Sequence, residues 1–580
     1  MGAPISIRKA YEGRHVLVAG GSGFLGKVWL AMVLERIPDV GRVYLLLRGK
    51  GRGVKERFEK IVNEGYVFAP LHERFGEGLA EHMAERLEVV AGDVSRPDLG
   101  LDPEVAERLR DRVDLVINFA GLVDFNPDLR DAADTNVMGA VHVADFVLSC
   151  KKAKLVHIST CYVAGQRDGR IPETVQPLAP SGAPIKAEVE LAELRRVIAR
   201  TELDNESPEV EAHLHKDVIK RLEGRGEASE RRIRDLVGRL KRKRLRETMA
   251  QAGTDRAKEL GWPNTYTYTK ALAEYLLLDR KERDGLDFAI FRPAIVESAV
   301  EFPFAGWNEG FNTSGPLVYL AKTWFRHIPA RQGNPLDVIP VDMVCKALLI
   351  TGAAVMRGEH AQVYQCGSSD RNFLPIDRLT ELSALGHRRW LREHGESALH
   401  KVILARWDAL AADPDHVLNL GNIRSVMNQV TRYLRHGLPE KIPSELQEAA
   451  DRLAKETDSS NRRLRQIEDV LELFQPFTHD HYCVFECRAV DRHPVVEPEL
   501  RFEPESIEWR SYWLEVHMPG LRRWCFPSSE NKERELYRPR VPFVLREPID
   551  RDGPEALHGP GGAEPEVAEP EVTDARKETG

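Results

Sequence analysis

The chain has few cysteines, seven among 580 residues, and they are scattered without the rhythm of a disulfide framework. It also lacks any run of about twenty apolar residues, so the sequence predicts no helix that spans a membrane. Residues 1–13 do not contain the apolar core of a signal peptide. These absences together lead us to expect a cytoplasmic protein with free thiols.

An excess of positive charge is absent too, because the net charge is −8 with 30% charged residues. The composition therefore indicates no nucleic-acid partner. No internal repeat is found, and 580 residues are enough for two or more domains. The one cluster of metal-ligand residue types has no standard zinc spacing, so we expect no metal site at His479, His481, Cys483 and Cys487.

Near its start the chain has a glycine-rich turn between a short apolar strand, residues 14–20, and a helical pattern. A second strand follows, and this order favours a dinucleotide site over a flexible loop. The first glycine makes the turn, the second lets a pyrophosphate approach the helix N-terminus, and the third lets the helix pack closely. The residues that we assign to cofactor binding here are Gly20, Gly23, Phe24, Leu25 and Gly26.

The second strand, residues 42–47, runs directly into Arg48. An acidic residue at this place binds the ribose 2′-hydroxyl of NAD, whereas an arginine accommodates the 2′-phosphate of NADP. We therefore favour NADPH as the cofactor. Solvated charge on a loop is the alternative explanation for Arg48, and for Lys50 and Arg52 beyond it.

Three further strands, near residues 87–94, 113–121 and 154–163, are expected to end at the same edge of the sheet. Doubly wound parallel sheets bind their ligands at the carboxyl ends of the strands. A carboxylate at the first of these ends suits an adenine amino group, and small residues at the second suit a border of the cofactor. The residues expected at this edge are Asp93, Val94, Asn118, Ala120, Ser159 and Thr160.

Tyr266 and Lys270 lie four residues apart in a stretch that has the pattern of a helix start. This spacing places the phenol and the ammonium on one face of the helix. The ammonium would lower the pKa of Tyr266, so that the phenol could pass a proton near neutral pH. By itself the spacing is more typical of an exposed aromatic–lysine pair, and only the other motifs favour a catalytic role.

The order of these motifs in the sequence resembles that of the extended short-chain dehydrogenases/reductases. Within that class the chain resembles the alcohol-forming fatty acyl-CoA reductases over roughly residues 10–545. It departs from the family at Ala19, where a threonine is usual. The stretches that carry the resemblance are 23–27, 157–160, 264–270, 291–296, 303–307, 337–344 and 507–522.

The resemblance implies a role for each of three side chains. Thr160 hydrogen-bonds the thioester or aldehyde oxygen, Tyr266 protonates the developing alkoxide, and Lys270 bonds the nicotinamide ribose. The implied reaction is reduction of long-chain acyl-CoA by NADPH to a fatty alcohol, through an aldehyde and with release of CoA. Without Tyr266, Thr160 would be read as a β-branched residue that fills a strand end.

Three rival functions stay open. An aldehyde-releasing reductase would use the same residues, and a sugar-nucleotide epimerase or dehydratase of the same superfamily would retain NAD tightly. A non-catalytic module could bind NADPH and dock on a membrane. No carrier-protein or adenylation segment precedes the reductase, so free acyl-CoA is the expected thioester.

The expected fold class is α/β, a Rossmann-type doubly wound parallel sheet. We expect an N-terminal extension (1–13), a reductase domain (14–375) with a charged helical insertion (185–260), a mainly helical C-terminal domain (376–545) and a disordered tail (546–580).

Within the insertion, the basic helix 231–246 has three explanations: a solvated helix packed on the reductase, peripheral membrane contact, or attraction of CoA phosphates. A group of aromatic residues suits either an apolar acyl channel or ordinary core: Phe302, Phe304, Trp307 and Phe311.

Overall fold

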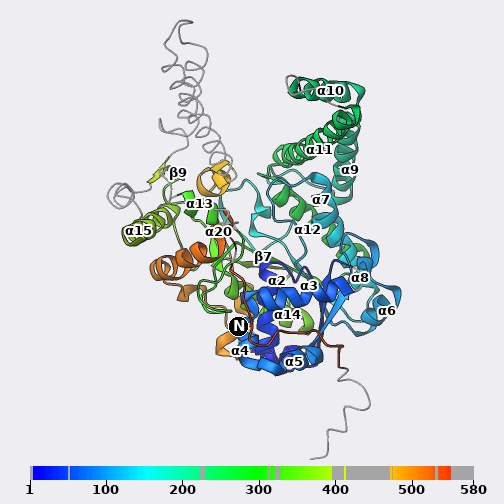
Figure 1. The fold of residues 1–580 in the computed structure, drawn as a ribbon. Coiled ribbons are helices and arrows are strands. Elements are labelled where there is room, and N and C mark those ends of the chain that lie inside the picture. The colour runs from blue at the N-terminus through cyan, green and yellow to red at the C-terminus, as the bar shows by residue number, and fades with distance from the viewer. Residues whose placement is uncertain are drawn as a thin grey trace, which may run out of the picture.

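The structure is a computed structural model, and it describes residues 4–49, 52–222, 229–310, 314–320, 327–394, 410–412, 471–472, 474–529, 533 and 535–549. A central sheet carries helices on both faces, and three helices project from this body as an arm (Figure 1). We refer to the sheet and the helices packed on it as the body.

The central sheet has seven strands, and every neighbouring pair is parallel. Their order, β11-β7-β5-β4-β1-β2-β3, is that of a doubly wound sheet, which confirms the predicted fold class. Most of these strands are buried along their whole length, and for that reason they appear in the sequence as continuous apolar runs. The strands are β1 (His15–Ala19), β2 (Arg42–Leu47), β3 (Leu87–Ala91), β4 (Leu115–Asn118), β5 (Lys154–Ile158), β7 (Phe288–Pro293) and β11 (Val363–Cys366).

Two hydrophobic layers enclose the sheet, and alternate residues of β1 enter opposite layers. Val16 and Val18 belong to the layer of α2 and α14, whereas Leu17 belongs to that of α8. Residues 4–13 of the predicted extension contribute to the first layer, where buried Tyr11 donates to the carbonyl of Leu349 (3.3 Å). The helices of the body are α1 (Ile7–Tyr11), α2 (Phe24–Arg36), α3 (Arg52–Glu64), α4 (Ala69–Phe75), α5 (Leu79–Arg86), α6 (Pro103–Arg112), α7 (Leu129–Ala132), α8 (Gly139–Ser149), α12 (Thr265–Asp284) and α14 (Val341–Arg357).

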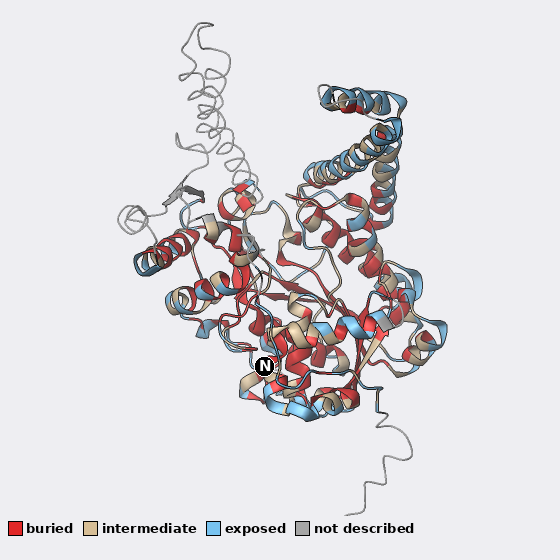
Figure 2. Cartoon of the chain, viewed as in Figure 1, coloured by how far each residue is buried: buried red, intermediate tan, exposed pale blue. Residues whose placement is uncertain are grey.

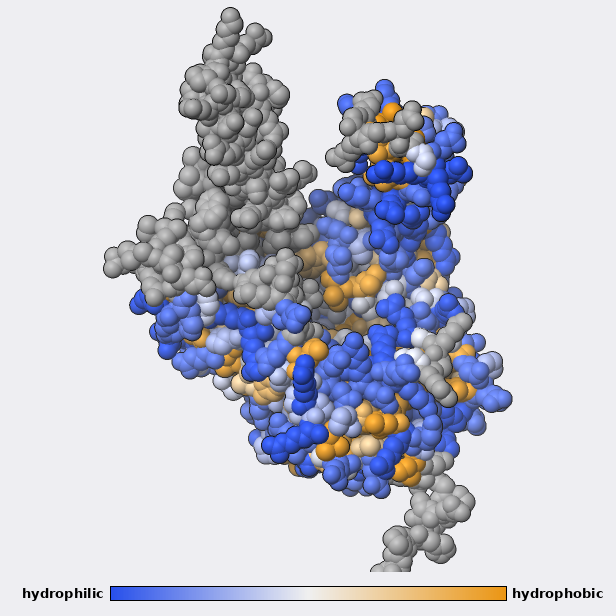
Figure 3. All heavy atoms as spheres, viewed as in Figure 1, coloured by the Kyte–Doolittle hydropathy of each residue, from blue (hydrophilic) through white to orange (hydrophobic). Residues whose placement is uncertain are grey.

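The arm consists of α9 (Ala187–Glu206), α10 (Pro208–Leu222) and α11 (Glu230–Leu260), so the predicted insertion is helical. Its surface is mostly exposed and hydrophilic (Figures 2 and 3). At its base the carboxylate of Glu190 accepts hydrogen bonds from Arg256 (3.0 Å) and from the phenol of Tyr268 on α12 (2.5 Å). The arm is thereby fastened to the helix that carries Tyr266.

The C-terminal part packs on the body instead of standing apart from it. Strand β13 (Cys483–Phe485) pairs in parallel with β6 (Gly169–Ile171) of the reductase region. Residues 546–549, predicted as the start of a disordered tail, lie on the body, where the Ile549 amide donates to Ala84 (2.9 Å). Within the predicted C-terminal domain (376–545), residues 395–409, 413–470, 473, 530–532 and 534 lie outside the described residues, as do residues 550–580.

The remaining elements are short. Two-stranded parallel pairs are formed by β8 (Ile295–Glu297) with β10 (Val338–Pro340), and by β9 (His327–Pro329) with β12 (Leu410–Ala412). The other helices are α13 (Gly315–Leu320), α15 (Ile376–His394), α18 (Trp509–Ser511), α19 (Met518–Gly520) and α20 (Phe526–Ser529). None of the helices in the described ranges combines the length and the apolar character needed to cross a membrane.

Of the aromatic residues with two explanations, Phe302 and Trp307 are buried members of the main hydrophobic cluster. Trp307 stacks on Phe24 with ring centroids 5.3 Å apart, and Phe304 lies 5.8 Å from Trp524. These contacts favour the core explanation over the acyl channel. Phe311 lies outside the described residues.

Candidate active site

The glycine turn between β1 and α2 has no room for side chains. Gly20 has φ +77°, and a Cβ there would lie 2.5 Å from the backbone nitrogen of Ala120. A Cβ at Gly26 would lie 2.7 Å from the Cα of Gly21, so α2 packs directly on the turn. Both positions therefore require glycine, in agreement with the predicted roles in turning and close packing.

Helix α2 begins at Gly23, and no side chain among the described residues caps its first amides. Free amides at the N-terminus of a helix favour an anion. The uncapped helix and the tight glycine turn both lie at the carboxyl edge of the sheet, so this part of the structure fits a dinucleotide cofactor.

Two predicted cofactor residues at strand ends have exposed or partly exposed side chains. Arg48 is exposed directly after β2, and its carbonyl accepts from Arg57 (3.1 Å). Asp93 follows β3, and its carboxylate accepts from the amide (3.0 Å) and the hydroxyl (2.9 Å) of Ser95. Their contacts with a cofactor stay predictions. Lys50 and the side chain of Arg52 lie outside the described residues.

Three other predicted cofactor residues have side chains that contact other parts of the protein. The amide oxygen of Asn118 accepts from the backbone of Ala120 (3.1 Å) and so shapes the loop after β4. Val94 packs in the second hydrophobic layer, and the side chain of Leu25 packs against the first. We expect these positions to meet a cofactor mainly through their backbone.

Helix α12 brings Tyr266 and Lys270 to the carboxyl end of β5. It begins at Asn264, whose side chain caps the amide of Thr267 (3.0 Å), so the predicted helix start is confirmed. Thr160 is the second residue after β5 and is 5% exposed. Its hydroxyl lies near enough to the phenol of Tyr266 to lower the pKa of that phenol. The same hydroxyl donates to the carbonyl of Pro293 (3.5 Å) and accepts from the amide of Tyr162 (3.3 Å). Two groups predicted from distant parts of the sequence therefore lie close together.

Lys270 lies one turn further along α12 and is buried, with 4% of its surface exposed. Its ammonium donates to the carbonyl of Ile158, the last residue of β5 (2.9 Å). Burial lowers the pKa of Lys270 to about 8, while the charge of Glu274 acts in the opposite direction. A Cβ at Gly121 would lie 2.8 Å from this nitrogen, so the loop after β4 also encloses the ammonium.

The prediction that Lys270 lowers the pKa of Tyr266 is wrong. Burial raises the pKa of Tyr266 to about 12, and the nearby hydroxyl of Thr160 offsets only part of that rise. The ammonium of Lys270 donates to the carbonyl of Ile158 instead. Tyr266 is therefore a protonated phenol at neutral pH, which suits a proton donor.

Three further polar residues lie around this site, and sequence reasoning assigned no role to Asn136 or His157 and expected only Ser159 at this edge. Asn136 accepts from the amide of Leu122 (2.7 Å) and donates to Thr269 on α12 (3.0 Å), so it joins the loop after β4 to the tyrosine helix. His157 Nε2 and Ser159 Oγ are buried without a hydrogen-bond partner among the described residues. No sequence periodicity indicates a role for Asn136. The unpartnered polar atoms of His157 and Ser159 at a strand end are typical of a ligand site.

Comparison with known proteins agrees with this geometry. An NAD-binding family described as male sterility protein matches residues 18–348. The alcohol-forming fatty acyl-CoA reductase of Simmondsia chinensis is 28% identical over 539 residues, 89% of this chain and 98% of the relative. Fatty acyl-CoA reductase 1 of Arabidopsis thaliana is also 28% identical, over 88% of this chain and 96% of the relative.

Among solved structures, the reductase domain of a non-ribosomal peptide synthetase from Mycobacterium tuberculosis is similar, with a TM-score of 0.46 and 17% identity over 89% of this chain and 95% of that one. The matched family spans more than half of the present chain, in the region that holds the glycine turn, Thr160, Tyr266 and Lys270. The protein therefore belongs to the male sterility protein family, is an oxidoreductase with a nicotinamide cofactor, and has the predicted kinship with the fatty acyl-CoA reductases.

Proposed function

We propose that the protein reduces long-chain fatty acyl-CoA to a fatty alcohol with NADPH, through an aldehyde and with release of CoA. The observation that carries this proposal is the convergence of three side chains at the carboxyl end of β5: the buried hydroxyl of Thr160, the phenol of Tyr266, and the buried ammonium of Lys270, which donates to the carbonyl of Ile158 (2.9 Å). Two hydroxyls that lie close together can both hydrogen-bond a single carbonyl oxygen. The names of the relatives supply the substrate class.

The three side chains have separate tasks in this reaction. Thr160 polarises the carbonyl, and Tyr266 donates a proton to the oxygen as negative charge develops on it. We assign the buried ammonium of Lys270 to the nicotinamide ribose, which it would hold beside these two hydroxyls. The nicotinamide cofactor, when bound, supplies the hydride.

The overall reaction has two reductive stages. One hydride and one proton convert the thioester to a hemithioacetal, which expels the CoA thiol and leaves an aldehyde. A second hydride and a second proton convert the aldehyde to a primary alcohol. The exposed guanidinium of Arg48 at the end of β2 supports NADPH as the hydride source, since it suits a 2′-phosphate.

We expect the enzyme to consume two NADPH for each palmitoyl-CoA and to yield hexadecanol. The measurement is NADPH oxidation across a panel of acyl-CoA lengths, with the product identified by mass spectrometry and NADH as the comparison cofactor. One NADPH per thioester with hexadecanal as the end product would support the aldehyde-releasing rival. No turnover of any thioester, together with tightly retained NAD, would overturn the proposal in favour of an epimerase or dehydratase.

The arm carries a second part of the proposal, which is peripheral contact with an anionic membrane. Within 231–246, apolar positions such as Leu236 and Val237 are partly buried, while most of the basic side chains are exposed. Ion pairs within the described residues are formed by Lys241 with Glu211 (4.0 Å) and by Lys243 with Glu247 (3.6 Å). The other cations of this segment form none there, so they are available to lipid phosphates.

Vesicle sedimentation tests this contact. We expect the protein to sediment with vesicles that contain phosphatidylserine at low salt, and to lose most of that binding when Arg239, Arg242 and Arg246 are changed to glutamate. The reductase activity of this variant on a soluble short-chain substrate should be unchanged. Equal sedimentation of both proteins would leave only the solvated-helix explanation or attraction of CoA.

A further inference from the structure

A cluster of aromatic rings lies beside Tyr266 and continues away from it. Phe125, on the loop after β4, has its ring 6.4 Å from that of Tyr266, and its carbonyl accepts from the Tyr266 amide (3.3 Å). Phe477 lies 6.0 Å from Phe125 and 4.7 Å from Tyr162, which follows Thr160 by two residues. We call these rings, together with Phe474 and Phe485, the aromatic wall: Phe125, Tyr162, Phe474, Phe477 and Phe485.

The aromatic wall combines two distant parts of the chain. Phe125 and Tyr162 come from loops at the carboxyl edge of the sheet. Phe474 lies 5.7 Å from Phe125, and Phe485 on β13 lies 5.3 Å from Tyr162. The C-terminal part therefore contributes three of the five rings. The rings of Phe125, Tyr162 and Phe477 are only partly buried, so their free faces can take an apolar ligand.

A narrow cleft lies along this wall. Three aromatic rings line it, together with prolines, small residues and three polar side chains: Tyr162, Phe477, Phe485, Pro263, Pro335, Pro476, Ala164, Gly165, Cys483, Gln166, Asp337 and His481. The carboxylate of Asp337 in the lining has hydrogen-bond partners, since it accepts from the amides of Ser368 and Ser369 (2.7 and 3.2 Å). An aromatic wall beside a proton donor suits a substrate with a long hydrocarbon tail.

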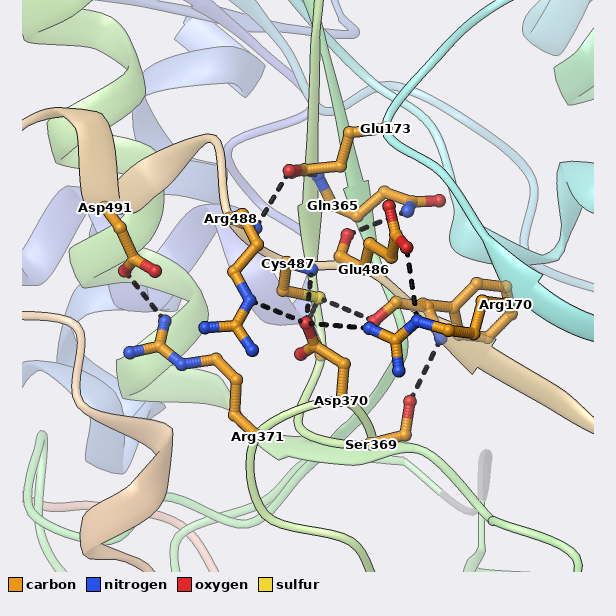
Figure 4. A network of polar contacts seen from close by, with 12 residues as sticks. Arg170, Glu173, Gln365, Ser369, Asp370, Arg371, Glu486, Cys487, Arg488 and Asp491 are labelled. Atoms are coloured by element: carbon orange, nitrogen blue, oxygen red, sulfur yellow. Dashed lines mark hydrogen bonds and ion pairs between the residues drawn. The ribbon is translucent and has the colours of Figure 1, made fainter.

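Two carboxylates hold the C-terminal part of the wall in place, those of Glu173 and Asp370 (Figure 4). Glu173 accepts from the amides of Arg488 (2.8 Å) and Ala489 (2.6 Å), and Asp370 accepts from that of Cys487 (3.2 Å). Charge-assisted hydrogen bonds to backbone amides fix the chain irrespective of its side chains. The wall is therefore a rigid part of the body.

The segment between Phe477 and Phe485 is held in the same way. The side-chain amide of Asn334 donates to the carbonyls of His479 and His481 (3.1 Å each). The amide of Phe485 donates to the hydroxyl of Ser369 (3.1 Å). Both ends of the cleft-lining segment are thus positioned by residues of the reductase body, and rigid sites discriminate between ligands better than mobile ones.

We infer that the cleft along the aromatic wall binds the acyl chain of the substrate, and that Phe477 determines the preferred chain length. This inference rests on the proposed function, since it places the tail of the same acyl-CoA whose carbonyl meets Thr160 and Tyr266. A long chain reaches Phe477 and gains from its burial, whereas a short chain ends before it. The C-terminal part of the protein then determines which acyl-chain lengths are bound preferentially.

The experiment compares Phe477→Ala with the wild-type enzyme over acyl-CoA substrates from the shortest that is turned over to C18. We expect KM for C16 and C18 to rise about tenfold, since one aromatic contact is lost, while KM for the shortest substrate and kcat for all of them stay within about twofold. Phe477→Leu, which keeps much of the volume, should give an intermediate effect and guards against misfolding.

Phe543→Ala is the matched control, because that buried ring packs edge-on against Phe58 (6.0 Å) away from the cleft. It should lower stability without changing chain-length preference. An equal change at every chain length, or none, in Phe477→Ala would overturn the inference. If the wild type reduces no thioester, the proposed function fails; calorimetric binding of palmitoyl-CoA, weakened in Phe477→Ala but not in Phe543→Ala, then still decides on the cleft.

Discussion

Replacing Tyr266 with phenylalanine should lower kcat/KM for acyl-CoA by about 10²–10⁴-fold and leave the affinity for NADPH unchanged. The substitution removes one oxygen, which is the proton donor and lies near the hydroxyl of Thr160. The ring remains beside Phe125, so the packing of α12 is kept. Steady-state turnover and fluorescence titration with NADPH measure the two quantities on the same preparation.

Tyr275→Phe provides the control on the same helix. That phenol donates to the carbonyl of Leu178 (2.8 Å) and is not in contact with Thr160 or Lys270. Its loss should cost about 1 kcal/mol of stability and leave activity intact. Turnover by Tyr266→Phe at the wild-type rate would mean that the phenol donates no proton, and a docking module would then be the better explanation.

Arg292→Met should lower the free energy of unfolding by about 3–5 kcal/mol, the largest stability effect that we expect from a single substitution. The guanidinium on β7 makes two hydrogen bonds to the carboxylate of Glu274 on α12, one of them 2.9 Å long, and a third to the carbonyl of Thr174 (3.0 Å). Only 6% of the Arg292 side chain and 0% of that of Glu274 are exposed. Removing the cation leaves a buried carboxylate without its counter-ion.

Urea denaturation followed by circular dichroism measures this loss. The double variant Arg292→Met with Glu274→Leu should recover most of it, because it removes both charges together. Arg357→Met is the exposed control: its pair with Glu359 (2.9 Å) lies at the surface and should contribute at most about 1 kcal/mol. A single-variant loss no larger than that of the control would mean that the pair does not hold α12 on the sheet.

Much of the fold and half of the candidate site could be predicted from local sequence patterns. Strands buried on both faces produce apolar runs, and the turn at Gly20 and Gly26 admits only glycine, so both leave a signal in a few neighbouring residues. The same holds for Tyr266 and Lys270, since a helix fixes their separation. Their proximity to Thr160 needed the resemblance to known reductases, because nothing local joins the two segments.

The electrostatics of the site and the aromatic wall were not readable. The pKa of Tyr266 depends on how deeply the phenol is buried, which is a property of the packed protein. Phe477 and Phe485 look like ordinary core residues in the sequence. Glu173 accepts a hydrogen bond from the amide of Arg488, which lies 315 residues further along the chain. This contact holds the C-terminal segment at the place where Phe477 lies beside Tyr162.

The pairing of β13 with β6 has a consequence for synthesis of the protein. When the ribosome has made residues 1–375, the glycine turn, Thr160, Tyr266 and Lys270 already exist, yet Glu173 and Asp370 still lack the amides that they bind. A chain truncated there would retain a place for the nucleotide while exposing the ring of Tyr162 and the edge of β6. Residues 483–488 must therefore be synthesised before this part of the reductase is whole, and a chain that stops before them would expose an edge prone to aggregation.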